Sequence, residues 1–217
     1  MNIKWNGHAS FTISASDGTV LVTDPYDPNG YSGVLRYEQV KDRADAVLVS
    51  HDHADHNYVK GLPGSPKIIR TSAEVKGIQI NGVATHHDDS GGSKRGKNVV
   101  FVFSIDGIRN CFMGDLGHQL SPEQINDIGP VDILLIPVGG TYTVDSGGAV
   151  LIVESLDPKV IIPMHFKTDK CDLPIAPADE FLQKMSSVKQ LQKSEIELSP
   201  DMLPTTKPEV WVLDHAC

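Results

Sequence analysis

The seven residues from Ser50 to His56 concentrate side chains that can bind metal. They read Ser-His-Asp-His-Ala-Asp-His, so three imidazoles and two carboxylates follow the serine. Imidazole and carboxylate are the ligands that zinc and similar divalent ions prefer in proteins. The apolar run Ala46–Val49, directly before this stretch, predicts a buried strand. We therefore predict a metal site at the end of a strand, with hydrolysis as its chemistry.

The spacing within this stretch favours two metal positions over one. His51 and His53 alternate along an extended segment, so both imidazoles lie on one side and can reach the same ion. Asp55 and His56 begin the following turn and can point toward a neighbouring position. A tetrahedral centre takes three protein ligands and a water, so four clustered ligands are too many for one ion.

Three later segments have the same form, an apolar strand followed by a side chain that can bind metal. They end in the pair His86 and His87, in Asp115 and in His165. Because functional groups gather on loops at strand ends, we expect these side chains to complete the first cluster. Adjacent residues on an extended backbone face opposite ways, so His86 and His87 cannot easily serve the same ion.

Further short motifs surround these residues. In chain order they are Trp5-x-Gly7-His8, His87-Asp88-Asp89-x-Gly91-Gly92, Arg95-Gly96-Lys97-Asn98, Gly114-Asp115-Leu116-Gly117-His118 and Pro163-Met164-His165. With the H-x-H-x-D-H pattern, they make the chain resemble the metallo-β-lactamase fold superfamily, and its small single-domain zinc-dependent hydrolases similar to the ascorbate-phosphate lactonase group. The resemblance covers nearly the whole chain. It implies an α/β fold, a four-layer αββα sandwich, formed by one domain over residues 1–217.

The resemblance also implies the metal ligands. It implies two divalent ions, zinc as the first choice and Mn²⁺ or Fe²⁺ as alternatives. The implied ligands of the first ion are His51, His53 and His87. Those of the second ion are Asp55, His56 and His165, and Asp115 would bridge the two ions. His87 is preferred to His86 because the family pattern places its histidine directly before two aspartates.

The charge of such a site constrains its substrate. Two divalent ions contribute +4 and the carboxylates of Asp55 and Asp115 contribute −2, so the site carries about +2, or about +1 once a bridging hydroxide is present. This charge suits an anionic substrate or the oxyanion of a tetrahedral intermediate. We expect the bridging hydroxide to attack a carbonyl or phosphoryl centre, with Asp55 orienting the hydroxide.

Three other residues are candidates for a role at the site, each with an ordinary alternative. His118 could act as a general acid, and Tyr142 could hydrogen-bond a substrate oxyanion, but both could simply be loop residues. His8 could hydrogen-bond a metal ligand without binding the metal itself, or it could be an ordinary residue of a β-hairpin.

Basic residues near the motifs could contact an anionic substrate. The candidates are Arg95, Lys97 and Lys167, although exposed bases are usually only solvated. Lys167 is preferred because it lies two residues beyond His165.

Short apolar runs separated by Gly, Pro and Asp predict the strands that must position these side chains. The expected strands are 3–5, 10–14, 20–23, 46–49, 67–71, 99–105, 109–113, 131–137, 160–163, 196–198 and 210–213. Ser121, followed by Pro122 and Gln124, predicts a helix that ends near Gly129. The other expected helices are 147–156 and 178–187, with shorter ones in 35–43 and 56–60.

The composition is ordinary for a globular protein, with 40% hydrophobic and 22% charged residues. The net charge of −9 argues against a binder of long nucleic acids or anionic membranes. No apolar run approaches the roughly 20 residues that a membrane-spanning helix needs. The lack of a basic and apolar leader, and three cysteines without a CxxC pair, favour a cytoplasmic protein. The expected partner is a small, anionic substrate molecule.

Hydrolysis of a small ester, lactone or phosphorylated metabolite is the leading functional hypothesis. The alternative is a metal-dependent phosphodiesterase or nuclease that acts on short nucleic acids. A true β-lactamase is disfavoured because no secretory leader is evident. A non-catalytic metal-binding protein is disfavoured because every ligand position of the family pattern is filled.

Overall fold

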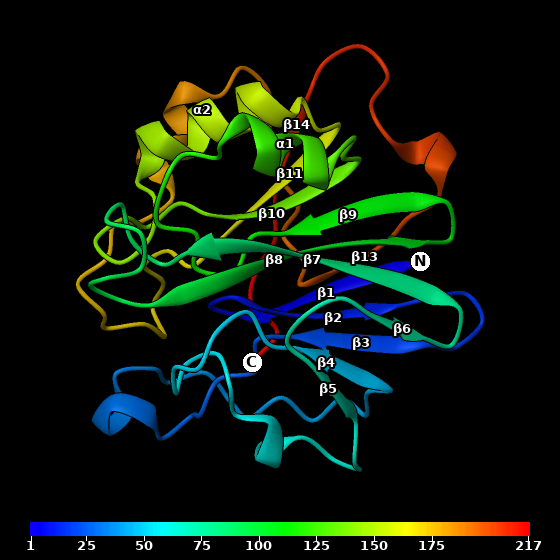
Figure 1. The fold of residues 1–217 in the computed structure, drawn as a ribbon, viewed down its shortest axis with the longest axis vertical. Coiled ribbons are helices and arrows are strands. Elements are labelled where there is room, and N and C mark those ends of the chain that lie inside the picture. The colour runs from blue at the N-terminus through cyan, green and yellow to red at the C-terminus, as the bar shows by residue number, and fades with distance from the viewer.

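Two mixed β-sheets stacked face to face form the centre of the computed structural model, which describes residues 1–217 (Figure 1). One sheet has six strands in the order β13-β1-β2-β3-β4-β5, and the other has eight in the order β12-β14-β11-β10-β9-β8-β7-β6. The strands are β1 (Asn2–Gly7), β2 (Ser10–Ser14), β3 (Val20–Thr23), β4 (Ala46–Leu48), β5 (Lys67–Ile69), β6 (Ala73–Val75), β7 (Ile78–His86), β8 (Lys97–Ile105), β9 (Ile108–Phe112), β10 (Ile133–Pro137), β11 (Val160–Met164), β12 (Val188–Gln190), β13 (Glu195–Glu197) and β14 (Glu209–Val212).

The directions of the strands decide where the predicted ligands lie. In the six-stranded sheet, β1 and β3 run antiparallel to β2, and β4 runs parallel to β3. In the eight-stranded sheet, β7 and β9 run antiparallel to β8, and β10 and β11 run parallel to β9. The carboxyl ends of β1, β3 and β4 therefore share one edge, and so do those of β7, β9 and β11. Every segment predicted to bind metal follows one of these ends.

Alternation of side chains along the strands builds the core. Leu21 and Leu48 belong to a cluster of 48 buried residues that joins the two sheets. Val22 and Val47, on the opposite face, belong to a second cluster of 11 buried residues that includes side chains from the loop segment 26–44. Because both faces of these strands are buried, the strands are continuously apolar in sequence.

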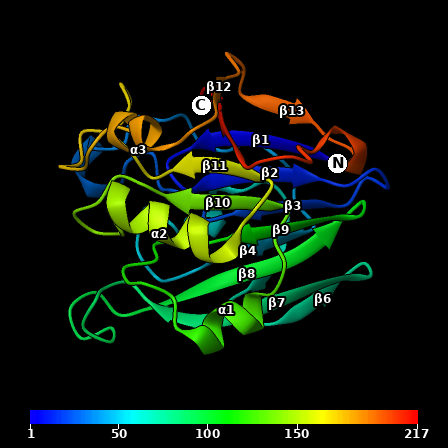
Figure 2. The same ribbon diagram turned by 90° about the horizontal axis from the view of Figure 1, so that it is seen from above.

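Three α-helices cover the outer face of the eight-stranded sheet (Figure 2). They are α1 (Pro122–Ile128), α2 (Ser146–Leu156) and α3 (Asp179–Lys184). The start of α1 is a capping box in which the Ser121 hydroxyl accepts the N–H of Gln124 and the Gln124 side chain accepts the N–H of Ser121. All three of the longer predicted helices are confirmed.

The two shorter predicted helices are wrong as α-helices. Residues 35–43 contain no helix, and residues 56–60 contribute only to a 3₁₀ turn, Val59–Gly61. Leu35 and Tyr37 are buried while the residues on either side of Tyr37 are exposed. This alternation has the period of an extended chain and not that of a helix.

Loops and 3₁₀ turns cover the outer face of the six-stranded sheet, where an αββα sandwich would place helices (Figure 1). The predicted α/β sandwich is confirmed, with this outer layer built from irregular segments. None of the helices is both long enough and apolar enough to cross a membrane.

Candidate metal centre

Three histidines from the two sheets form the first group of the site. His51 and His53 follow β4, and His87 follows β7. One ring nitrogen of each lies within 4.8 Å of those of the other two. His51 and His87 are buried, and His53 is half-buried. Three imidazoles at this spacing can hold one divalent ion and leave a position for water or substrate.

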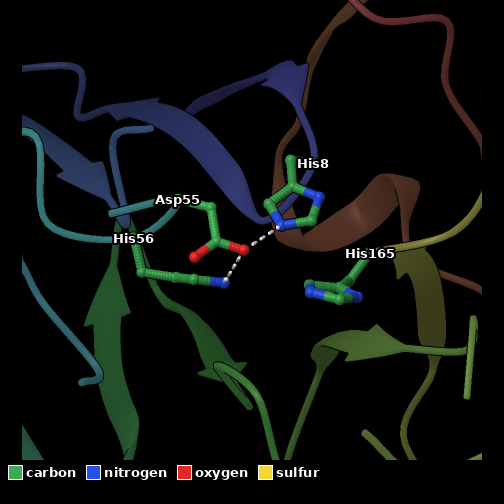
Figure 3. A group of neighbouring side chains, drawn as sticks. All are labelled: His8, Asp55, His56 and His165. Carbon is green, nitrogen blue, oxygen red and sulfur yellow. Dashed lines mark hydrogen bonds and ion pairs between the residues drawn. The ribbon is translucent and has the colours of Figure 1, made fainter. Parts of the chain in front are cut away.

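A second group contains four buried residues, His8, Asp55, His56 and His165 (Figure 3). Their ligand atoms all lie within 4.8 Å of one another. Oδ2 of Asp55 is 3.1 Å from Nε2 of His8 and 3.4 Å from Nε2 of His56. The structure therefore brings His8 into direct contact with a predicted ligand.

Asp115 lies between the two groups. Its Oδ2 atom is 3.3 Å from Nε2 of His87 in the first group. The same oxygen is 3.2 Å from Nε2 of His56 and 3.2 Å from Nε2 of His165 in the second. One carboxylate thus touches imidazoles of both groups.

Several buried polar atoms in this cluster have no hydrogen-bond partner. They include Nε2 of His51, Nε2 of His56 and Oδ1 of Asp115. Buried polar atoms are nearly always paired, so unpaired ones require an explanation. Divalent cations would satisfy these atoms, because neutral imidazole and carboxylate are their preferred donors. The residues present therefore fit a bound metal.

Burial and local charge set the protonation of the cluster. Burial lowers the pKa of His51 to about 2 and that of His8 to about 4, so both rings are neutral. Burial also opposes protonation of His56, but the carboxylates of Asp115 and Asp55 hold its pKa well above the ordinary value. The neighbouring imidazoles outweigh burial at Asp115 and hold its pKa well below the ordinary value. His51 thus offers a neutral imidazole and Asp115 an anionic carboxylate, whereas His56 carries a proton that a bound metal would displace.

Asp24 supports the site and was missed from the sequence. Nδ1 of His56 donates to Oδ2 of Asp24 over 2.9 Å, which directs Nε2 of His56 toward the cluster. The backbone N–H and the hydroxyl of Ser50 donate to the same carboxylate at 2.7 and 2.5 Å. One signal was available, since Asp24 directly follows the apolar strand β3, just as the predicted ligands follow theirs.

Asn98 and Gly114 hold Asp115 in place. Oδ1 of Asn98 accepts the N–H of Asp115 at 3.0 Å, and its amide donates to the carbonyl of Met113 at 2.9 Å. Gly114 has a φ of 54°, and a Cβ there would lie only 2.5 Å from Oδ1 of Asn98. A side chain at position 114 would therefore displace the group that positions Asp115.

Three non-glycine residues of the site have left-handed backbone conformations. The φ angles are 52° at His8, 30° at Asp24 and 50° at His165. Such conformations cost about 1–3 kcal/mol each and persist where the surroundings enforce them, commonly at functional sites. The N–H of His165 donates to the carbonyl oxygen of His8 at 3.1 Å, so these two strained turns support each other.

A cavity of about 320 Å³ opens onto the cluster. It is lined by Tyr31, His53, Asp55, His87, Lys94, Arg95, Asp115, Tyr142, His165 and Leu173. Tyr142 therefore lies at the cavity, where a contact with substrate is feasible. The hydroxyl of Tyr31 donates to Oδ1 of Asp55 at 3.2 Å. Sequence reasoning missed Tyr31 because it lies in an irregular segment with no pattern of its own.

His118 and Lys167 do not line this cavity. Nε2 of His118 accepts the N–H of His86 at 3.1 Å, and its Nδ1 donates to the carbonyl of Gln119 at 2.7 Å. Nζ of Lys167 donates to the carbonyl of Leu173 at 3.1 Å. The backbone therefore occupies both ring nitrogens of His118, and its role as a general acid stays a prediction without support from its position.

A two-sheet α/β sandwich with a buried His/Asp cluster at its strand ends defines a class of metal-dependent enzymes. Residues 2–165 match the family described as the Beta-lactamase superfamily domain, and the chain belongs to that family. The resemblance to the metallo-β-lactamase fold superfamily, drawn from the sequence motifs, is confirmed.

Known relatives agree with this assignment. A UPF0173 metal-dependent hydrolase of Archaeoglobus fulgidus is 29% identical, over 92% of this chain and 96% of its own length. Another, from Carboxydothermus hydrogenoformans, is 30% identical, over 77% of this chain and 85% of its own length. A crystal structure from Thermotoga maritima, assigned to the Zn-dependent hydrolases of the metallo-beta-lactamase superfamily, has a TM-score of 0.78 and 38% identity, covering 98% of this chain and 97% of that one. The chain is accordingly a metal-dependent hydrolase.

Proposed function

We propose that this hydrolase works with two divalent ions on a small ester, lactone or phosphorylated metabolite, and that residues 1–217 act as one domain. The position of Asp115 carries the proposal, because its Oδ2 atom lies 3.2–3.3 Å from imidazoles of both groups. Zinc is the first choice, as in the description of the Thermotoga maritima relative. The proposed ligands are His51, His53 and His87 for one ion, Asp55, His56 and His165 for the other, and Asp115 for both.

When bound, the ions would supply Lewis acidity and lower the pKa of water. The chain's own residues prepare the site for this chemistry. Tyr31 donates to one oxygen of Asp55, and His8 lies 3.1 Å from the other, so the carboxylate is held in one orientation. Tyr142 lies on the cavity wall, where its phenol can hydrogen-bond a substrate oxygen. The cavity volume of about 320 Å³ suits a small molecule.

Metal analysis joined to a substrate panel tests this proposal. The purified protein should contain about two metal ions per chain. It should hydrolyse members of a panel of esters, lactones and phosphomonoesters. Phosphodiesters are tested beside this panel, and turnover of phosphodiesters alone would favour the phosphodiesterase alternative. Tight metal binding without turnover on any member of the panel would overturn the proposed activity.

His87→Ala is expected to remove about one metal ion per chain, and His86→Ala to leave the metal content unchanged. Nε2 of His87 lies 3.3 Å from Asp115, whereas the His86 ring packs against His118 at a centroid distance of 5.5 Å. Elemental analysis of the two variants after gel filtration is the measurement. Equal metal loss in both variants would contradict the choice of His87.

His8→Ala is expected to weaken zinc binding by about 10–100-fold, because Asp55 loses the group that orients one of its oxygens. His8→Gln should restore part of the affinity, since the side-chain amide of glutamine keeps an N–H donor at about the reach of Nε2 of histidine. Competition with a chromogenic chelator measures the affinity. A zinc affinity that is unchanged in His8→Ala would show that Asp55 does not depend on His8.

A further inference from the structure

Arg95 is a cation at the cavity whose charge no protein group neutralises. It lines the 320 Å³ cavity and also a second hollow of about 390 Å³, and both hollows share His53. Arg95 is a half-buried residue whose guanidinium makes no ion pair and no hydrogen bond with the protein. Only the backbone N–H of Arg95 is engaged, by Asp88. Its neighbour Lys94, by contrast, pairs with Asp89 at 2.9 Å. In a chain with a net charge of −9, such an unpaired guanidinium is available to a ligand.

A single buried carboxylate fixes the turn that presents Arg95. Asp88 accepts four backbone N–H groups from residues 90–95, at distances of 2.7–3.0 Å. Asp88 directly follows His87, so the same turn fixes the position of the Arg95 backbone relative to a proposed metal ligand. A charge on a rigid support loses little entropy when it binds a partner.

The Arg95 side chain is also positioned by an aromatic ring. Its Cζ atom lies 5.4 Å from the ring centroid of Tyr142, which is within range of a cation–π interaction. Tyr31 and Leu173 add further apolar surface to the same cavity. The cavity therefore combines metal-binding side chains, one free guanidinium and an apolar wall.

We propose that Arg95 binds a phosphate or carboxylate group that the substrate carries apart from the bond being hydrolysed. The substrates are then small anionic esters or lactones. A guanidinium forms two parallel hydrogen bonds with the oxygens of either anion. In the reaction the ester C–O bond breaks, water adds its oxygen to the acyl carbon, and the leaving oxygen receives a proton. The anionic group thus contributes to substrate binding and does not take part in the reaction. This inference rests on the proposed function and narrows its substrate class.

Matched esters test the inference with the zinc-loaded protein. The substrates are 4-nitrophenyl butyrate, which is neutral, mono-4-nitrophenyl glutarate, which ends in a carboxylate, and the 4-nitrophenyl ester of 4-phosphobutyric acid. Arg95→Ala should raise KM for the two anionic esters by about tenfold and change KM for the neutral ester by no more than about twofold. For the anionic esters, KM of Arg95→Lys should lie between the values of the wild type and of Arg95→Ala. The larger effect identifies the preferred anion. Lys193→Ala removes an exposed charge elsewhere and should change nothing.

Two outcomes overturn the inference. The first is that Arg95→Ala leaves the discrimination between neutral and anionic esters unchanged. The second is that Arg95→Ala leaves the affinity for inorganic phosphate unchanged in a calorimetric titration. The inference predicts that this substitution weakens phosphate binding by about tenfold. If the zinc-loaded wild type hydrolyses none of these three esters, the wider substrate panel still decides the proposed function. The phosphate titration then decides alone, and an unchanged affinity in Arg95→Ala overturns the role of Arg95.

Discussion

Asp115→Ala is expected to remove most of the bound metal and to lower kcat by about 10³-fold, equivalent to about 4 kcal/mol of transition-state stabilisation. The reason is that Oδ2 of Asp115 lies 3.2–3.3 Å from His56, His87 and His165, so one substitution removes an anionic donor from both groups. Elemental analysis and turnover of the best substrate in the panel measure the two effects.

A matched control for this substitution is Asp127→Ala. Asp127 is exposed on α1 and forms no ion pair, so its removal changes the net charge equally without touching the cluster. Metal content and kcat should stay at the wild-type values. If Asp115→Ala kept both ions and full turnover, the bridging role of Asp115 would be wrong.

Removal of metal by a chelator is expected to abolish turnover and to lower the Tm by about 10 °C, and added zinc should restore both. A ligand present at about 1,000 times its Kd stabilises the native state by about 4 kcal/mol. For a chain of this size, each kcal/mol shifts the Tm by about 2–4 °C. Without metal, Nε2 of His51 and Oδ1 of Asp115 remain buried without partners.

Thermal scans with and without chelator, followed by zinc addition, provide the measurement. The double variant His51→Ala and His53→Ala is the matched control, because the first group then keeps only His87. Its Tm should respond less to the chelator than that of the wild type, because only the second group can still hold an ion. Turnover that persists in a fully demetallated sample would contradict the metal-dependent mechanism.

The sequence allowed most of the candidate cluster to be predicted, because its residues combine metal-binding chemistry with a place directly after an apolar strand. Asp24 has the same placement but is a lone acid, which looks like an ordinary turn residue. His8 could be named as a candidate, but its contact with Asp55 depends on how the two strand ends meet. For the basic residues, proximity in sequence favoured Lys167, whereas the structure places Arg95 at the cavity.

The strands that escaped prediction lack the usual apolar pattern. β6 and β12 are only three residues long and lie at the two edges of the eight-stranded sheet. Before His86 the sequence indicated only a short strand, because β7 contains Gly82, which normally weakens a strand. A Cβ at Gly82 would lie 3.0 Å from the backbone carbon of Thr71, so this glycine permits a close approach of two segments. Such a packing requirement is invisible without the neighbouring segment.

The donors of each proposed ion come from both sheets, and this has a consequence for how the protein matures. His51 and His53 follow a strand of the six-stranded sheet, whereas His87 and His165 follow strands of the eight-stranded sheet. A chain in which only one sheet has formed therefore offers an incomplete set of donors and retains metal poorly. Metal binding would then favour chains in which both sheets have docked.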